Sequence, residues 1–158
     1  MAWQQRGILS ASFGRSIPDS RIILAINSEY GRTQDWLHVH MSCVLDTVRK
    51  RIDAVDQNNP PFWKPVAGGV LGHDYWIRPT TAQELHEFGP FKLLSDGIAG
   101  AGEDMGKFSL AMTISQSGDF ILLATRRNLL NLNLGSAEEL QDHDCRGLPP
   151  SEDKSATG

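Results

Sequence analysis

The sequence lacks features that would assign it at once to several classes of protein. No apolar run in its 158 residues approaches the roughly 18 residues of a membrane span, and its first residues form no signal peptide. Positive charge is not in excess, because 15 Lys and Arg stand against 19 Asp and Glu, which argues against a general nucleic-acid binder. As written, the chain is expected to be neither inserted in a membrane nor exported.

Cysteine is also scarce, with only Cys43 and Cys145 in the chain. Two cysteines are too few to decide the compartment in which a protein works. They could be two buried thiols or one bridge between the middle of the chain and its C-terminal end. The count alone leaves both options open.

The residues that are present suit one folded domain. With 40% hydrophobic residues and a net charge of −4, the composition is that of an ordinary soluble α/β or α+β domain, long enough to bury its own core. Strands are predicted at 21–26, 36–42, 108–115 and 119–125, the last two joined by a turn at Ser117-Gly118. Helices are predicted at 2–13, 44–55, 80–88 and 90–98, with a last short helix capped by Ser136. Residues 62–79 are expected to be irregular with one short strand, the basic run 49–51 to be a solvated helix face, and 146–158 to be a disordered tail.

The most informative local pattern is the run from His38 through His40 to Ser42. Residues two apart on a strand point to the same side, so these three side chains are expected on one face. A neutral imidazole can act as a nucleophile or bind a metal, so a bare pair could be a surface pair, a metal pair or a catalytic pair. A metal would need further ligands, and the other histidines lie at unrelated spacings, so no metal site is predicted.

The surroundings of the histidine pair favour catalysis. Asn27 ends the preceding strand, and Gln34 lies just before His38. This arrangement resembles the signature of the histidine-triad superfamily of nucleotide hydrolases and transferases, with Ser42 in place of the third histidine. The resemblance implies that His40 is the nucleophile that attacks phosphorus and that His38 holds the geometry of the site. It also implies that the side chains of Asn27, Gln34 and Ser42 hydrogen-bond phosphate oxygens.

Further segments resemble one family of that superfamily, the CDP-diacylglycerol pyrophosphatases. They keep their order along almost the whole chain, at residues 24–28, 31–34, 38–43, 48–50, 68–73, 122–130 and 136–145. The resemblance implies an α+β fold over residues 1–145, with a histidine-triad-like antiparallel sheet and flanking helices. It implies hydrolysis of CDP-diacylglycerol to CMP and phosphatidate through a nucleotidyl-histidine intermediate, without a cofactor. Two alternatives stay open: a broader nucleotidyl hydrolase or transferase, and an inactive nucleotide- or lipid-binding remnant.

The resemblance also bears on partners and compartment. Family members carry a hydrophobic anchor and strands ahead of the helix in which Met1 falls, so this chain is expected to lack the anchor and the first strands and to be soluble. The family implies the periplasmic face of the inner membrane, which favours a Cys43–Cys145 bridge. Expected partners are CDP-diacylglycerol and, through it, the membrane surface, with no nucleic acid and with a homodimer as an option. His73 is expected to be structural, and Arg126 and Arg127 could either anchor the fold or contact a lipid phosphate.

Overall fold

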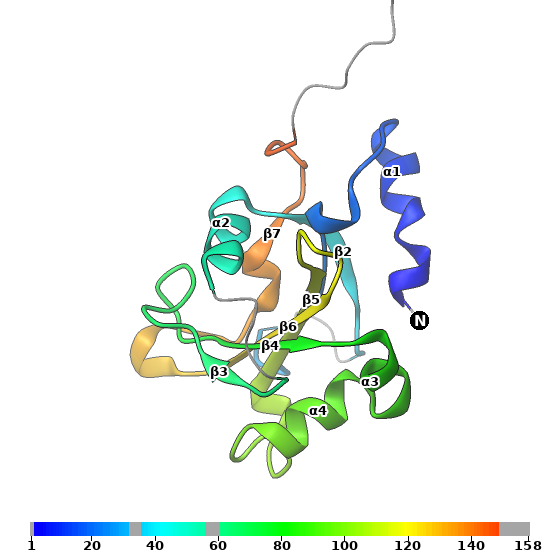
Figure 1. The fold of residues 1–158 in the computed structure, drawn as a ribbon. Helices are drawn as coiled ribbons and strands as arrows, with labels where there is room; N and C mark the ends of the chain where they lie inside the picture. Colours follow the sequence, from blue (N-terminus) through cyan, green and yellow to red (C-terminus); the bar gives the residue numbers. More distant parts are fainter. Residues whose placement is uncertain (1, 32–35, 56–60, 149–158) are drawn as a thin grey trace, which may run out of the picture.

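A computed structural model describes residues 2–31, 36–55 and 61–148, and its centre is a seven-stranded sheet (Figure 1). The strand order is β3-β4-β6-β5-β1-β2-β7, and each pairing is antiparallel. The strands are β1 (Ile22–Ile26), β2 (His40–Val44), β3 (Lys64–Pro65), β4 (Trp76–Thr80), β5 (Phe108–Ile114), β6 (Phe120–Arg126) and β7 (Gln141–Asp142). The α+β class expected from the sequence is confirmed.

The described residues form four α-helices and five 3₁₀ turns, which precede the first strand or connect the strands. The helices are α1 (Gly7–Phe13), α2 (Asp46–Ala54), α3 (Ala82–Glu87) and α4 (Gly89–Gly97), and the turns are η1 (Ala2–Gln5), η2 (Asp19–Arg21), η3 (Met105–Lys107), η4 (Leu129–Asn131) and η5 (Ala137–Leu140). Helix α3 begins at a capping box between Thr81 and Glu84, at the threonine pair where the sequence predicts a cap. In the part of the chain that the structure describes, none of these helices combines the length and apolar content needed to cross a bilayer.

The sheet is covered on both faces. On one face, Ile23, Val44 and Leu123 pack in a buried cluster with residues of α2 and η5. On the other face, Leu110 and Leu122 pack with residues of α3 and α4, while Trp3 and Leu9 at the N-terminal end cover Ile22 and Leu24. Alternate residues of each central strand therefore enter separate clusters. This is why β1 is apolar on both of its faces.

Strand β2 begins at His40, not at residue 36 as the alternation predicts. The neighbouring strand β1 ends at Ile26, and the last pair between the two strands joins Ala25 to His40. Within the described ranges no strand pairs with residues 36–39, and they are irregular. As a result, His38 lies outside the strand that carries His40.

Other local expectations also need correction. Arg49 is buried, not solvated, because its guanidinium donates to the carbonyl oxygens of Ser20 and Ile114. The segment after Ser136 is a 3₁₀ turn in place of a helix, and the Ser136 hydroxyl donates to the Asn27 side chain without capping it. Residues 62–79, expected to hold one short strand, contain β3 and all of β4 except its last residue, Thr80. Leu148, assigned to the disordered tail, is buried in the structure, while residues 149–158 lie outside the described part.

Cys43 and Cys145 form a disulfide whose Cα atoms are 5.2 Å apart, which confirms the expected bridge. Both residues are fully buried, Cys43 in β2 and Cys145 just after β7. The bridge closes a loop of 102 residues and fastens the C-terminal segment to the strand that carries His40.

Replacing both cysteines by alanine should lower the free energy of unfolding by about 2–4 kcal/mol, because a long loop in the unfolded chain is no longer closed. Urea denaturation of the oxidised chain and of C43A/C145A measures the difference. Added reductant should bring the midpoint of the oxidised chain close to that of the variant and leave the variant unchanged. Equal midpoints for the oxidised chain and the variant would contradict a stabilising role for the bridge.

Candidate active site

His40 lies at one end of the sheet, where several strand ends meet. It pairs with Ala25 near the end of β1, while Phe108 at the start of β5 pairs with Arg126 at the end of β6. Because neighbouring strands run antiparallel, the same end of the sheet holds the start of β2, the end of β1, the start of β5 and the end of β6. The imidazole of His40 extends toward the face that α2 and η5 cover, because Ala25 opposite it belongs to that cluster.

The ring of His40 lies against the carboxylate of Glu138 in η5. Its Nδ1 atom is 3.2 Å from Oε1 of Glu138, and the two side chains are 35% and 31% exposed. A carboxylate only accepts hydrogen bonds, so it favours the tautomer with hydrogen on Nδ1 and the lone pair on Nε2. Among the described residues no hydrogen-bond partner engages Nε2, so the arrangement presents a partly exposed imidazole whose Nε2 can act as a nucleophile, with a negative charge behind it.

Asn27 holds Glu138 in this position. The Asn27 side chain is buried, and its amide nitrogen donates to Oε2 of Glu138 at 2.8 Å. Its oxygen accepts from the backbone nitrogen of Glu138 at 3.1 Å and from the hydroxyl of Ser136 at 3.2 Å. The structure thus places Asn27 beneath the carboxylate that faces His40, with its amide already engaged by protein.

The other predicted site residues have different surroundings. His38 is exposed, its Nδ1 lies 2.8 Å from the carbonyl oxygen of Trp36, and its ring centre is 6.4 Å from that of His40. Ser42 is buried, and its hydroxyl donates to the carbonyl oxygen of Asp142 at 2.9 Å, so it ties β2 to β7 and does not face open space beside His40. Gln34 lies outside the described residues.

Two residues that the sequence analysis did not single out support the site. Glu138 contacts the ring of His40, and Gln141 holds its backbone, since the Gln141 amide donates to the carbonyl oxygens of Ile23 at 3.2 Å and His40 at 3.0 Å. Both lie within residues 136–145, a segment that resembles the family. That resemblance was the available signal, but nothing local to the segment indicates which strand it meets.

A partly buried polar cluster fixes the backbone next to Glu138. Glu139 accepts a hydrogen bond from the hydroxyl of Tyr75 at 2.7 Å, and Nδ1 of His73 lies 2.9 Å from its other oxygen. Burial and the neighbouring Glu139 charge raise the pKa of Tyr75 far above its usual range, so Tyr75 stays a neutral donor. His73 thus links the loop before β4 to η5 through Glu139, and its structural role stays a prediction.

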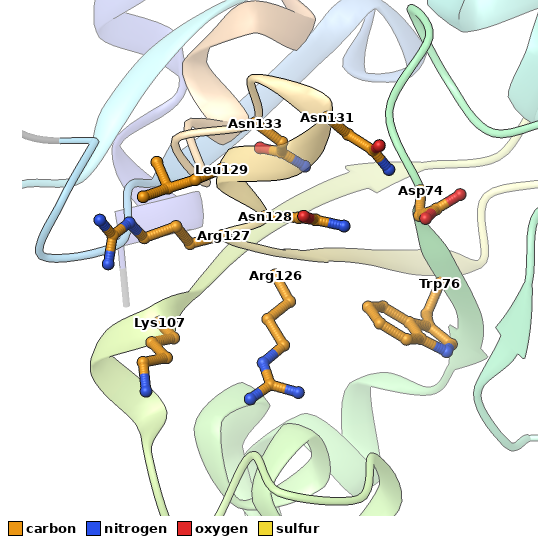
Figure 2. Close-up of a pocket in the computed structure, with 9 residues that line it drawn as sticks. All are labelled: Asp74, Trp76, Lys107, Arg126, Arg127, Asn128, Leu129, Asn131 and Asn133. Carbon is orange, nitrogen blue, oxygen red and sulfur yellow. The ribbon is translucent and has the colours of Figure 1, made fainter.

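A basic pocket opens at the same end of the sheet as His40. It has a volume of about 390 Å³, and Lys107, Arg126 and Arg127 supply positive charge along its lining, with Asp74 as the acidic member (Figure 2). The guanidinium of Arg126 lies 5.7 Å from the ring centre of Phe108. Within the described ranges, no group of three or more His, Cys, Asp or Glu side chains is placed to hold a metal ion.

Known proteins resemble this chain over nearly its whole length. Residues 1–149 match the family described as CDP-diacylglycerol pyrophosphatase. Over 148 residues the chain is 50% identical to the CDP-diacylglycerol pyrophosphatase of Yersinia pestis, a match that covers 94% of this chain and 57% of that protein. The chain thus spans a little over half the length of this relative. Because the family match extends from the first residue to beyond β7, and so includes His40, Asn27 and Glu138, the chain belongs to the CDP-diacylglycerol pyrophosphatase family.

Proposed function

We propose that this chain carries the catalytic histidine of an enzyme that hydrolyses CDP-diacylglycerol to CMP and phosphatidate. The observation that carries the proposal is the contact between Nδ1 of the partly exposed His40 and Glu138, which leaves Nε2 without a partner among the described residues. Membership of the family supports the choice of substrate, as does the activity for which the Yersinia pestis relative is named.

In the first step, Nε2 of His40 attacks the phosphorus that bears the cytidine. The bond from this phosphorus to the bridging oxygen breaks, and phosphatidate leaves with the electron pair. CMP is then joined to the imidazole, which has become positively charged because Nδ1 keeps its hydrogen. The carboxylate of Glu138, 3.2 Å from Nδ1, stabilises that charge as it develops.

In the second step, water attacks the same phosphorus. The phosphorus–nitrogen bond breaks, its electron pair returns to Nε2, and one proton of the water passes to solvent. CMP is released with the oxygen of that water, and His40 is again neutral with its hydrogen on Nδ1. Glu138 keeps its charge throughout, so its part is to orient the ring and to stabilise the intermediate.

We assign the other predicted residues according to their surroundings. Asn27 and Ser42 act as framework residues, since each is buried and hydrogen-bonded to protein. His38 fixes the chain that enters β2, because its ring contacts the carbonyl oxygen of Trp36. Gln34 remains the predicted donor to a phosphate oxygen.

We further propose that the reaction takes place at a lipid surface in an extracytoplasmic compartment. The diacylglycerol part of the substrate keeps it in a membrane, so the enzyme must meet it at that surface. The buried Cys43–Cys145 disulfide supports an oxidising compartment, because such bonds are rare in reducing cytosol.

Replacing the proposed nucleophile, as in His40→Asn, should lower kcat by at least about 1,000-fold, because the covalent route is lost. CMP release from CDP-diacylglycerol in detergent micelles measures the effect. The matched control is His86→Asn, an exposed histidine on α3, which packs on the opposite face of the sheet from the one that His40 faces and should retain full activity. Full turnover by His40→Asn would show that another group is the nucleophile.

The same assay with a soluble CDP ester separates the alternatives. Release of CMP from CDP-diacylglycerol alone supports the proposed substrate, and release from both compounds indicates a broader nucleotidyl hydrolase. Release from neither compound would indicate an inactive protein that only binds nucleotide or lipid, and it would overturn the proposal for this chain.

The variant Glu138→Gln should lower kcat by about 100- to 1,000-fold, because the side chain keeps its shape and its contact with Asn27 but loses the charge behind the ring. KM should change by less than about threefold, since Glu138 stabilises the charged ring and not the bound substrate. Steady-state kinetics on CDP-diacylglycerol gives both constants, with Glu87→Gln on the exposed side of α3 as the control. An unchanged kcat would remove Glu138 from the mechanism.

A further inference from the structure

The connection after β6 exposes a set of leucines. In residues 129–134, which we call the leucine loop, Leu130 is 95% exposed and Leu132 is 85% exposed, and Leu129 and Leu134 are exposed as well. Scattered single leucines on a surface are ordinary, but four exposed leucines within six residues concentrate apolar surface on one loop. A patch of this kind marks a surface that contacts something apolar.

The leucines are held outward by a defined loop structure. Asn128 and Asn133 exchange backbone hydrogen bonds of 2.8 and 2.9 Å, and the Asn128 side chain accepts from the backbone nitrogen of Leu130. Asn133 is buried, and its side chain donates to Thr125 and accepts from the backbone nitrogen of Gly135. Asn133 thus faces the protein and Asn128 closes the turn, while the leucines of the loop are exposed.

Leu132 adopts a left-handed backbone conformation with φ of 54°. This conformation is unfavourable for leucine and persists only where the surrounding structure enforces it. The fold therefore maintains a strained turn that presents an apolar side chain to solvent. Such a turn points to a function for the exposed side chains.

Positive charge lies directly beside the leucine loop. Arg126 and Arg127 precede the loop and line the basic pocket with Lys107, as Figure 2 shows. Lys107 pairs with Asp104, whereas no carboxylate of the described residues lies within ion-pair distance of either arginine. Arg126 is exposed, and Arg127 lies over the ring of Tyr30 at 3.8 Å. Leucines next to unpaired arginines match a bilayer interface, where acyl chains and lipid phosphates lie side by side.

The leucine loop also lies at the same end of the sheet as His40. Arg126 at the end of β6 and His40 at the start of β2 lie at the same end of the sheet, because each neighbouring pair among β6, β5, β1 and β2 is antiparallel. A bilayer that contacts the leucine loop would therefore lie toward the end of the molecule at which His40 is found.

From these observations we propose that the leucine loop, with Lys107, Arg126 and Arg127, is a docking surface for an anionic lipid bilayer. Leu130 and Leu132 enter the interface between headgroups and acyl chains, and the arginines contact lipid phosphates. This surface goes beyond the proposed hydrolysis, and its affinity for lipid is measurable without substrate or turnover.

The test is sedimentation with vesicles that contain phosphatidylglycerol and phosphatidylcholine in equal parts and no CDP-diacylglycerol. The double variant L130S/L132S should bind at least about tenfold more weakly, because two apolar side chains no longer enter the bilayer. Arg126→Gln should weaken binding about fivefold, and added salt should weaken binding of the unaltered chain. Vesicles of phosphatidylcholine alone should bind less than the anionic vesicles.

The matched control is Ile8→Ser, which removes an apolar side chain that is 60% exposed on α1. Helix α1 and the leucine loop lie at opposite sides of the ribbon in Figure 1, so this variant should bind vesicles like the unaltered chain. Urea midpoints of all variants show whether each is folded.

Failure of the unaltered chain to bind, or binding that the leucine variant leaves unchanged, would overturn the proposal. So would a leucine variant that changes only the oligomeric state in gel filtration, since the loop would then contact another copy of the chain. The variant His40→Asn should bind vesicles normally, so loss of hydrolysis and loss of docking are distinguishable. A chain inactive on CDP-diacylglycerol that still binds through the leucine loop would uphold docking and contradict only the proposed reaction.

Discussion

The candidate site depends on the contacts that the C-terminal segment makes with β1, β2 and the residue after β1. Gln141 donates to the backbone of His40 across 101 residues of sequence, Asn27 contacts Glu138 across 111, and the disulfide closes a loop of 102. Each of these contacts costs chain entropy that only the folded sheet offsets. His40, the proposed nucleophile, and the carboxylate of Glu138 therefore come together only when the C-terminal segment has packed against β1 and β2.

The partial exposure of Glu138 suits its proposed part in the reaction. A fully buried carboxylate would lose much of its hydration. The interaction of a fully exposed carboxylate with the His40 ring would be weakened by water and salt. At 31% exposure, Glu138 keeps some hydration while one oxygen is held by the buried Asn27 and the other lies beside His40. The free-energy cost of placing the Glu138 charge is thus offset partly by solvent and partly by the neutral amide of Asn27. The electric field of this charge at Nδ1 of His40 therefore stays strong.

Features that depend on neighbouring residues in the sequence could be predicted, and features that depend on distant partners could not. The cap of α3 between Thr81 and Glu84 and the short apolar strand β1 follow from local chemistry. The start of β2 depends on where β1 ends, and the burial of Arg49 depends on two carbonyl groups contributed by other segments. The pairing of Glu138 with His40 has no local signal, because an acidic residue in the first turn of a helix-like segment is common on any surface.

The connection between β6 and β7 joins the proposed lipid contact to the proposed chemistry. Its leucine loop is followed at once by Gly135, which accepts from the backbone nitrogen of Ser28, and the Ser28 hydroxyl donates to the carbonyl oxygen of Leu134. The residue before Ser28 is Asn27, which directly follows β1 and holds Glu138. Successive hydrogen bonds to the end of β1 therefore set the leucine loop and the carboxylate behind His40 on the same support. A lipid-linked substrate requires such a link, because its diacylglycerol part stays in the bilayer while its pyrophosphate must reach a fixed nucleophile.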